Sequence, residues 1–137
     1  MKKLYIISFL VFLFDRITKI LVENFIDKDI SIIKNIFYLT YVKNDGAAFS
    51  ILETQRILLV VLSITALVFL IYFISKKDKN NIGYFFLVGG ILGNLVDRIF
   101  LGYVIDFIGI SSFPIFNIAD IFIVLGAILV IFEKEKK

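Results

Sequence analysis

The chain has 137 residues, of which 60% are hydrophobic, and a mean hydropathy of +0.96. A water-soluble domain of this length could not cover so much apolar surface, because small domains leave much of their surface exposed. The composition therefore predicts an integral membrane protein. The net charge of +3 arises from short Lys clusters, which indicate membrane orientation and not nucleic-acid binding.

The sequence contains no Cys and no His. Cys nucleophiles, Ser-His-Asp triads, His-ligated zinc and structural disulfides are therefore excluded. Any chemistry must use carboxylates, amides, hydroxyls, Lys or Arg.

Four apolar segments predict membrane-spanning helices in a single domain, residues 1–137. The first, residues 4–23, begins like a secretory signal peptide, but no small-residue cleavage site follows, so we expect it to be retained. Residues 57–75 carry no charge over a length close to the roughly 20 residues needed to span a bilayer. The third and fourth helices are predicted at residues 82–98 and 115–132.

Lys residues gather at one end of this arrangement: Lys2, Lys3, Lys76, Lys77, Lys79, Lys134, Lys136 and Lys137. The positive-inside rule then predicts that both termini lie in the cytoplasm (N-in, C-in) and that residues 24–56 lie outside. Within that outer segment, Ile30–Val42 predicts one or two strands, and Asn44-Asp45-Gly46 predicts a turn. We expect a small β element between the first two helices, resting on the outer membrane surface.

Charged groups inside spanning helices are costly, by about 2.5–3.5 kcal/mol or more at the centre. Asp15 and Lys19 share one helix face, either as an ion pair that fixes helix packing or as residues that contact substrate or support a site. The third helix holds a run of small and polar residues: Gly89, Gly90, Gly93, Asn94, Asp97 and Arg98. The glycines predict close helix packing. Asp97 and Arg98 could form a helix-end pair, whereas Asn94 and Arg98 are candidates for a site.

Two further acids map to the outer membrane boundary. Asp106 lies in an apolar stretch, Val104–Phe107, that is strand-like or re-entrant. Asp120 is predicted about four residues into the fourth helix, roughly 6–9 Å below its outer end, with Asn117 on the same face. If the two acids face each other, repulsion and desolvation would make them share a proton, as in aspartic proteases. Structural and ion-pathway roles stay open on spacing alone.

Together these segments resemble lipoprotein signal peptidase (signal peptidase II), a family of bacterial membrane aspartic proteases. The matching pieces, in order along the chain, are Asp15–Lys19, Asn44–Phe49, Gly89–Arg98, Val104–Phe107 and Phe113–Asp120. Three features depart from the family pattern. Arg16 stands where Gln is more frequent, Phe113 stands where Trp is common, and the stretch between the two acids is short.

The resemblance implies that Asp106 and Asp120 are the catalytic pair and that Asn44 and Arg98 hold the substrate backbone. It implies a supporting role for another five residues: Asn94, Asp97, Asn117, Asp15 and Lys19. It also implies cleavage of diacylglyceryl-modified prolipoproteins before the lipidated Cys, near the outer face of the bacterial cytoplasmic membrane. The expected partners are these substrates and membrane lipid, with a monomeric enzyme and neither metal nor cofactor.

Three alternatives are kept for comparison. An ion-coupled transporter or channel subunit would use Asp15, Lys19 and Asp120 as a polar path. A serine/lysine membrane peptidase would use a hydroxyl such as that of Ser50 as its nucleophile. A non-enzymatic membrane scaffold would tolerate replacement of all of these polar residues.

Overall fold

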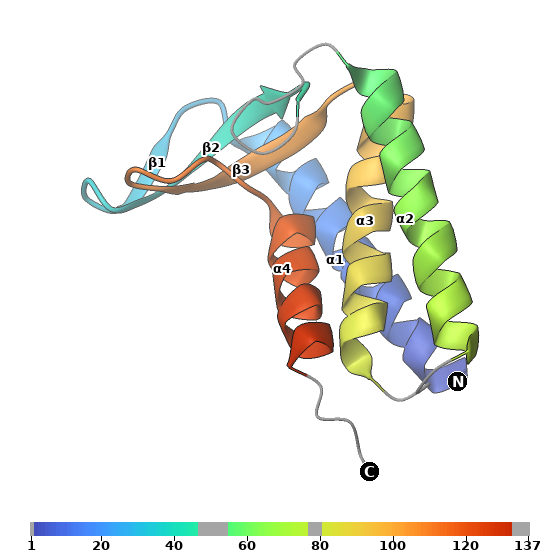
Figure 1. Ribbon diagram of the computed structural model, residues 1–137. Coiled ribbons are helices and arrows are strands. Elements are labelled where there is room, and N and C mark those ends of the chain that lie inside the picture. The colour runs from blue at the N-terminus through green and yellow to red at the C-terminus, as the bar shows by residue number, and fades with distance from the viewer. Residues whose placement is uncertain (1, 47–54, 77–80, 133–137) are drawn as a thin grey trace.

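The computed structural model describes residues 2–46, 55–76 and 81–132. Its elements are α1 (Lys2–Phe25), β1 (Ile30–Ile33), β2 (Phe37–Asn44), α2 (Arg56–Lys76), α3 (Ile82–Phe100), β3 (Val104–Ile110) and α4 (Ile118–Ile131). The helices form a bundle, and the sheet projects sideways from one of its ends (Figure 1). The mainly helical fold with a small sheet agrees with the prediction from the sequence.

Apolar side chains cover much of the outside of the bundle. In α2 only Leu59, Leu67 and Ile74 are buried, while Ile57 and Phe69 are 80% and 60% exposed. Both α2 and α3 are long and apolar enough to cross a membrane. An apolar exterior of this extent is costly in water but not in lipid, so the structure supports the membrane assignment.

The other two helices meet the length and composition of a membrane span less well. α1 carries Asp15, Arg16 and Lys19 near its middle, and α4 has only 14 residues. At 1.5 Å per residue, α4 is about 21 Å long, which is shorter than the roughly 30 Å hydrocarbon core of a bilayer.

The predicted start of the fourth helix at residue 115 is wrong, because α4 begins at Ile118. Phe116 instead forms backbone hydrogen bonds with Ile108 of β3, so it is not part of the helix. Asn117 then caps the helix and exchanges hydrogen bonds with Asp120 in a capping box. Asp120 therefore lies in the first turn of α4, and not about four residues below its end as the sequence suggested.

α3 is the central helix, and its glycines let neighbouring helices approach closely. A Cβ atom at Gly89 would lie 2.6 Å from the Ser8 carbonyl oxygen of α1. A Cβ atom at Gly90 would lie 2.6 Å from the Ala119 carbonyl oxygen of α4. Contacts this short with backbone atoms cannot form without moving a helix, so the packing role predicted for these glycines is confirmed.

We expect Gly90→Ala to lower the free energy of unfolding by about 1–3 kcal/mol, the usual cost of overpacking. The added methyl group must push the first turn of α4, which carries Asp120, away from α3. Thermal unfolding in detergent measures the loss of stability. Leu62→Ala, at an exposed position of α2, is the matched control and should unfold close to the wild type. Equal stability of the Gly90→Ala and control variants would contradict this close approach.

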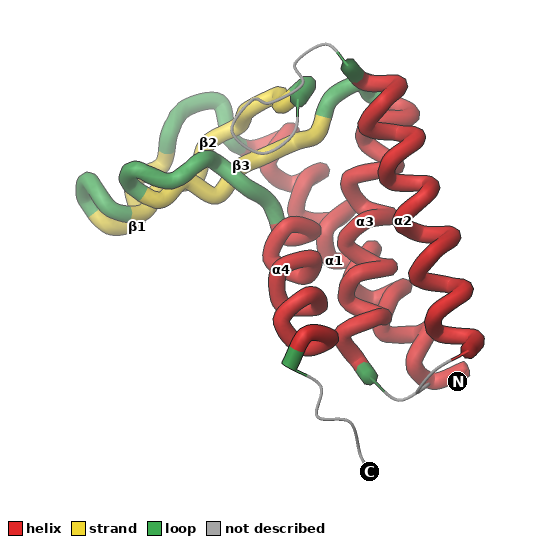
Figure 2. Tube along the Cα trace, in the orientation of Figure 1, coloured by secondary structure: helices red, strands yellow, loops and turns green. Residues whose placement is uncertain are grey.

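The sheet has the order β1-β2-β3 with antiparallel neighbours (Figure 2). Two strands, β1 and β2, lie between the first two helices, where the sequence predicted one or two. However, β3 follows α3, so the sheet also joins a segment from between the third and fourth helices.

The register of β2 against β3 shifts between Leu39 and Val42, which indicates a bulge. Beyond the shift, Val42 pairs with Asp106 and Asn44 pairs with Val104. Asn44 therefore lies on the same face of the sheet as Asp106, as its diagonal neighbour.

Candidate active site

Two carboxyl groups from different elements meet where the sheet joins the helices. Asp106 lies in β3 and is 3% exposed, and half-buried Asp120 lies in the first turn of α4. We refer to this pair as the dyad. Each of its four carboxylate oxygens accepts a hydrogen bond from an N–H group. Asn44 Nδ2 and Asn117 Nδ2 donate to Asp106 at 2.8 and 2.7 Å. Asn94 Nδ2 and the Asn117 backbone N–H donate to Asp120 at 2.8 and 3.2 Å.

Asn117 joins the two halves of the dyad. As the N-cap of α4 its side-chain oxygen accepts from the backbone N–H of Asp120, while its amide nitrogen donates to Asp106. The side chain is fully buried, so these bonds fix its orientation. Asn117 therefore both caps α4 and holds the carboxylate of Asp106 against this helix.

The environment of Asp106 favours its protonated form. Burial raises the pKa of the Asp106 carboxyl from its usual 3.8 to about 6, and the nearby charge of Asp120 acts in the same direction. Hydrogen bonds from Asn44 and Asn117 oppose this shift because they stabilise the carboxylate. Asn117 binds both carboxyl groups and so holds them near each other, as a pair that shares a proton requires.

Behind the dyad lies an ionic cluster formed by Asp15, Arg16, Lys19 and Asp97. Lys19 Nζ lies 2.8 Å from Asp15 Oδ2 and 2.8 Å from Asp97 Oδ2, and all three side chains are fully buried. Arg16 also pairs with Asp97. The predicted Asp15–Lys19 ion pair is confirmed. Asp97 pairs with Arg16 and Lys19 of α1. The sequence had left open a pair between Asp97 and its neighbour Arg98.

Arg98 stands apart from the dyad oxygens. Its Nη2 atom lies 3.4 Å from the Gly46 carbonyl oxygen, and the side chain is half-buried. The guanidinium therefore reaches the chain just after β2, two residues beyond Asn44. Ala47–Phe49 of the resemblance motif, and Ser50, fall outside the described residues.

One residue that supports this end of α3 was missed from the sequence. Arg56, the first residue of α2, donates from Nε to the Arg98 carbonyl oxygen at 2.6 Å and from Nη2 to the Ile99 carbonyl oxygen at 2.5 Å. A cation is favourable at these terminal carbonyls because of the helix dipole. Sequence spacing gave no signal for this contact, because the partners are 42 and 43 residues apart.

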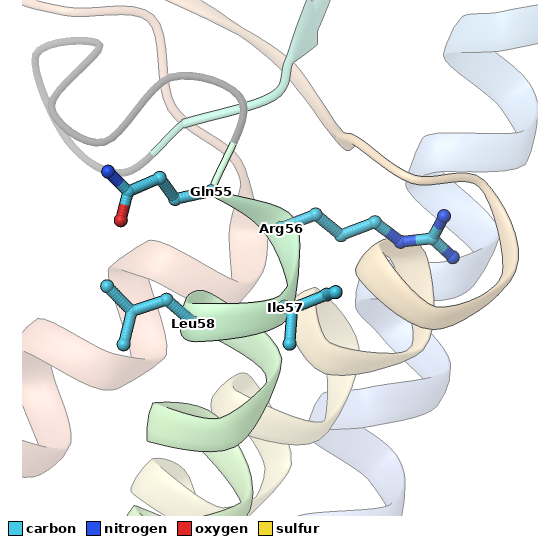
Figure 3. Close-up of a pocket in the computed structure, with 4 residues that line it drawn as sticks. All are labelled: Gln55, Arg56, Ile57 and Leu58. Carbon is cyan, nitrogen blue, oxygen red and sulfur yellow. The ribbon is translucent and has the colours of Figure 1, made fainter.

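Arg56 also borders a cavity of about 510 Å³, together with Gln55, Ile57 and Leu58. Figure 3 shows the Arg56 side chain extended toward the end of α3, while Gln55 points to the opposite side. This cavity lies at the start of α2, and no dyad residue lines it. Among residues 2–46, 55–76 and 81–132, no group of three or more acidic side chains is arranged to hold a metal ion.

Comparison with known proteins decides the family. The family model described as signal peptidase (SPase) II matches residues 7–134. The chain belongs to the signal peptidase II family. A lipoprotein signal peptidase from Caldicellulosiruptor bescii is 44% identical over 131 residues, which cover 93% of this chain and 87% of that protein. Another, from Halothermothrix orenii, is 39% identical over 140 residues and covers 96% and 97%.

Two solved structures of bacterial membrane enzymes share the fold of this chain. A bacterial membrane enzyme solved at 2.3 Å resolution superposes with a TM-score of 0.90 at 32% identity, over 100% of this chain and 94% of that one. A second, solved at 1.9 Å resolution, gives a TM-score of 0.88 at 32% identity, with coverages of 100% and 95%. The chain is therefore an aspartic endopeptidase by family, and the transporter or channel interpretation is not supported.

The structure brings together most of the residues that the sequence singled out. Five of them form the hydrogen-bonded dyad and its amide partners: Asn44, Asn94, Asp106, Asn117 and Asp120. Lys19 connects the ionic cluster to this group through its bond to Asn94. Arg98 is not hydrogen-bonded to this group and contacts the Gly46 carbonyl oxygen instead.

Proposed function

We propose that this enzyme cleaves the signal peptide from diacylglyceryl-modified prolipoproteins, just before the lipidated Cys, and that Asp106 and Asp120 activate the attacking water. The observation that carries the proposal is the pair of carboxyl groups from β3 and α4, held together through Asn117. The names of the related lipoprotein signal peptidases support the substrate class.

The two acids have different tasks in this mechanism. Asp106, the more deeply buried member, holds the shared proton and donates a hydrogen bond to the scissile carbonyl oxygen. Asp120 is the general base, which takes a proton from the water as the water oxygen attacks the carbonyl carbon. The tetrahedral intermediate then collapses, the C–N bond breaks, and the proton held by Asp120 passes to the leaving amine. The peptide bond is thus hydrolysed with no other reactant.

The proposed enzyme crosses the bacterial cytoplasmic membrane four times, with both termini inside. α1 starts, α2 ends, α3 starts and α4 ends at the same end of the bundle, opposite the sheet (Figure 1). Asn94, which contacts Asp120, lies six residues before the end of α3, so the dyad lies about 9 Å below that end. This depth suits a substrate whose acyl chains stay in the bilayer while its scissile bond reaches the carboxyl groups.

The outer part of the sheet supports contact with membrane lipid. Four Ile side chains around β1 are between 45% and 55% exposed: Ile30, Ile32, Ile33 and Ile36. β1, which carries three of them, lies on the part of the sheet that projects beyond the helices (Figure 1). We place these side chains in the outer lipid surface, where their apolar area is removed from water. A monomer suffices for this arrangement, since one chain supplies both carboxyl groups.

The test uses purified full-length enzyme in neutral detergent with a prolipoprotein in two forms, diacylglyceryl-modified and unmodified. The wild type should convert only the lipidated form, seen as a gel shift. Mass spectrometry should show the modified Cys at the new N-terminus. Absence of cleavage by folded enzyme, with the modification of the substrate verified, would overturn the proposed substrate class. Cleavage at another bond would overturn the proposed position.

A further inference from the structure

The ammonium group of Lys19 contacts three acceptors in the protein interior. Besides Asp15 and Asp97, Lys19 Nζ donates to Asn94 Oδ1 at 3.0 Å. The Lys19 side chain is fully buried, and its ammonium group has these three acceptor atoms within 3.0 Å. The contact with Asn94 joins the ionic cluster directly to a residue that binds the dyad.

This contact determines which way the Asn94 amide points. An ammonium group can only donate, so the atom of Asn94 that faces Lys19 must be the oxygen. Asn117 Nδ2 donates to the same oxygen at 3.1 Å, which fills both of its lone pairs. The amide nitrogen is left to face Asp120 Oδ1, at 2.8 Å. A flipped amide would place its N–H₂ group against two donors and its oxygen against a carboxylate.

We propose that Lys19 is a positioning residue that acts on Asp120 through the side-chain amide of Asn94. The inference rests on the proposed function of Asp120 and adds the reason why a buried cation lies behind it. The Lys19 contacts are with Asp15, Asp97 and Asn94 and not with the dyad oxygens. Its effect is to keep an N–H donor of Asn94 on the carboxylate that must accept the proton from water, and so to fix the direction of that carboxylate.

A purely structural role would be charge balance among the four members of the ionic cluster. Arg16 and Lys19 carry two positive charges, and Asp15 and Asp97 carry two negative charges. Removing Lys19 alone would leave a buried carboxylate without compensation and could unfold the protein. The double change Asp15→Asn with Lys19→Met removes one charge of each sign. The Asn side chain also keeps an oxygen that can accept the Ala119 backbone N–H, as Asp15 Oδ1 does now.

The experiment compares two charge-balanced double variants. In the first, Asp15→Asn is combined with Lys19→Met, which supplies no donor to Asn94. In the second, Asp15→Asn is combined with Lys19→Gln, which retains an N–H₂ group. We expect similar melting temperatures, because replacing a buried ion pair without leaving a lone charge is often tolerated. We expect kcat to fall by about 10–100-fold in the Met variant and by much less in the Gln variant, with KM unchanged in both.

A third measurement tests whether the effect passes through Asn94. In an Asn94→Ala background, the Met double change should alter kcat by less than about twofold, because the coupled partner is already absent. Equal kcat values for the folded Met and Gln variants would overturn the inference, and so would an undiminished loss in the Asn94→Ala background. The proposed function is judged separately, by whether the wild type cleaves the lipidated substrate in the same assay.

Discussion

Asp106→Asn and Asp120→Asn are each expected to abolish cleavage, with kcat lowered by at least the roughly 10²–10⁴-fold that a general acid or base contributes. An amide in place of Asp120 cannot take a proton from water, and an amide in place of Asp106 cannot be the shared acid. Both changes conserve shape. The Asn side chain at position 120 also keeps an oxygen for the Asn117 backbone N–H, which completes the capping box. The loss of activity should therefore occur without unfolding.

The measurement is single-turnover cleavage of the lipidated prolipoprotein, with melting temperatures recorded on the same samples. Asp29→Asn is the matched control, because Asp29 is an exposed acid outside the dyad and should keep wild-type activity. Ser50→Ala separates the dyad from the serine/lysine mechanism and should also remain active. A folded variant of Asp106 or Asp120 that retains turnover within a few-fold of the wild type would rule out that residue as a member of the dyad.

The sequence predicted the bounds of a helix well where the residues of that helix alone determine them. The uncharged run of α2 predicted its position to within one residue at each end. The start of α4 was missed because Ile115 and Phe116 look like helix residues in an apolar stretch. Tertiary pairing of Phe116 with Ile108 overrides that preference. The cap itself was readable, since Asn117 is one of the residue types preferred at the N-cap of a helix.

The position of Asn44 could not be read from the sequence, because it depends on the bulge in β2. A regular ladder continued from the Leu39–Ile108 pair would place Lys43 opposite Val104, and Lys43 would then be the diagonal neighbour of Asp106. The extra residue before Val42 moves Asn44 to that place and turns Lys43 to the other face. Lys43 lies over the ring of Tyr103 instead, 4.9 Å from its centroid. A one-residue shift thus exchanges a cation for an amide beside the dyad.

Cleavage is also expected to depend on pH through Asp106. Asn44 from β2 and Asn117 contact this carboxyl directly, and Asp120 from α4, Lys19 from α1 and Arg98 from α3 act on it through their charges. Their net effect together with burial is to raise the pKa of Asp106 to about 6, so the free enzyme keeps this proton below that pH and loses it above. If Asp106 is the acid, kcat/KM should fall by about tenfold per pH unit above the midpoint, since this ratio reports the free enzyme.

Asn44→Ala tests the direction in which the pKa of Asp106 moves. Asn44 Nδ2 donates to Asp106 and stabilises its ionised form, so removal of the amide should raise the pKa of Asp106 further and move the alkaline limb of kcat/KM to higher pH. The pH profile of kcat/KM for each variant is normalised to its own plateau. The measurements are made in neutral detergent, so that surface charge does not alter the local pH. Asp29→Asn should leave the midpoint in place. A limb that moves to lower pH in Asn44→Ala, or a wild-type profile that is flat from pH 5 to pH 8, would mean that the proton required for cleavage is not the one on Asp106.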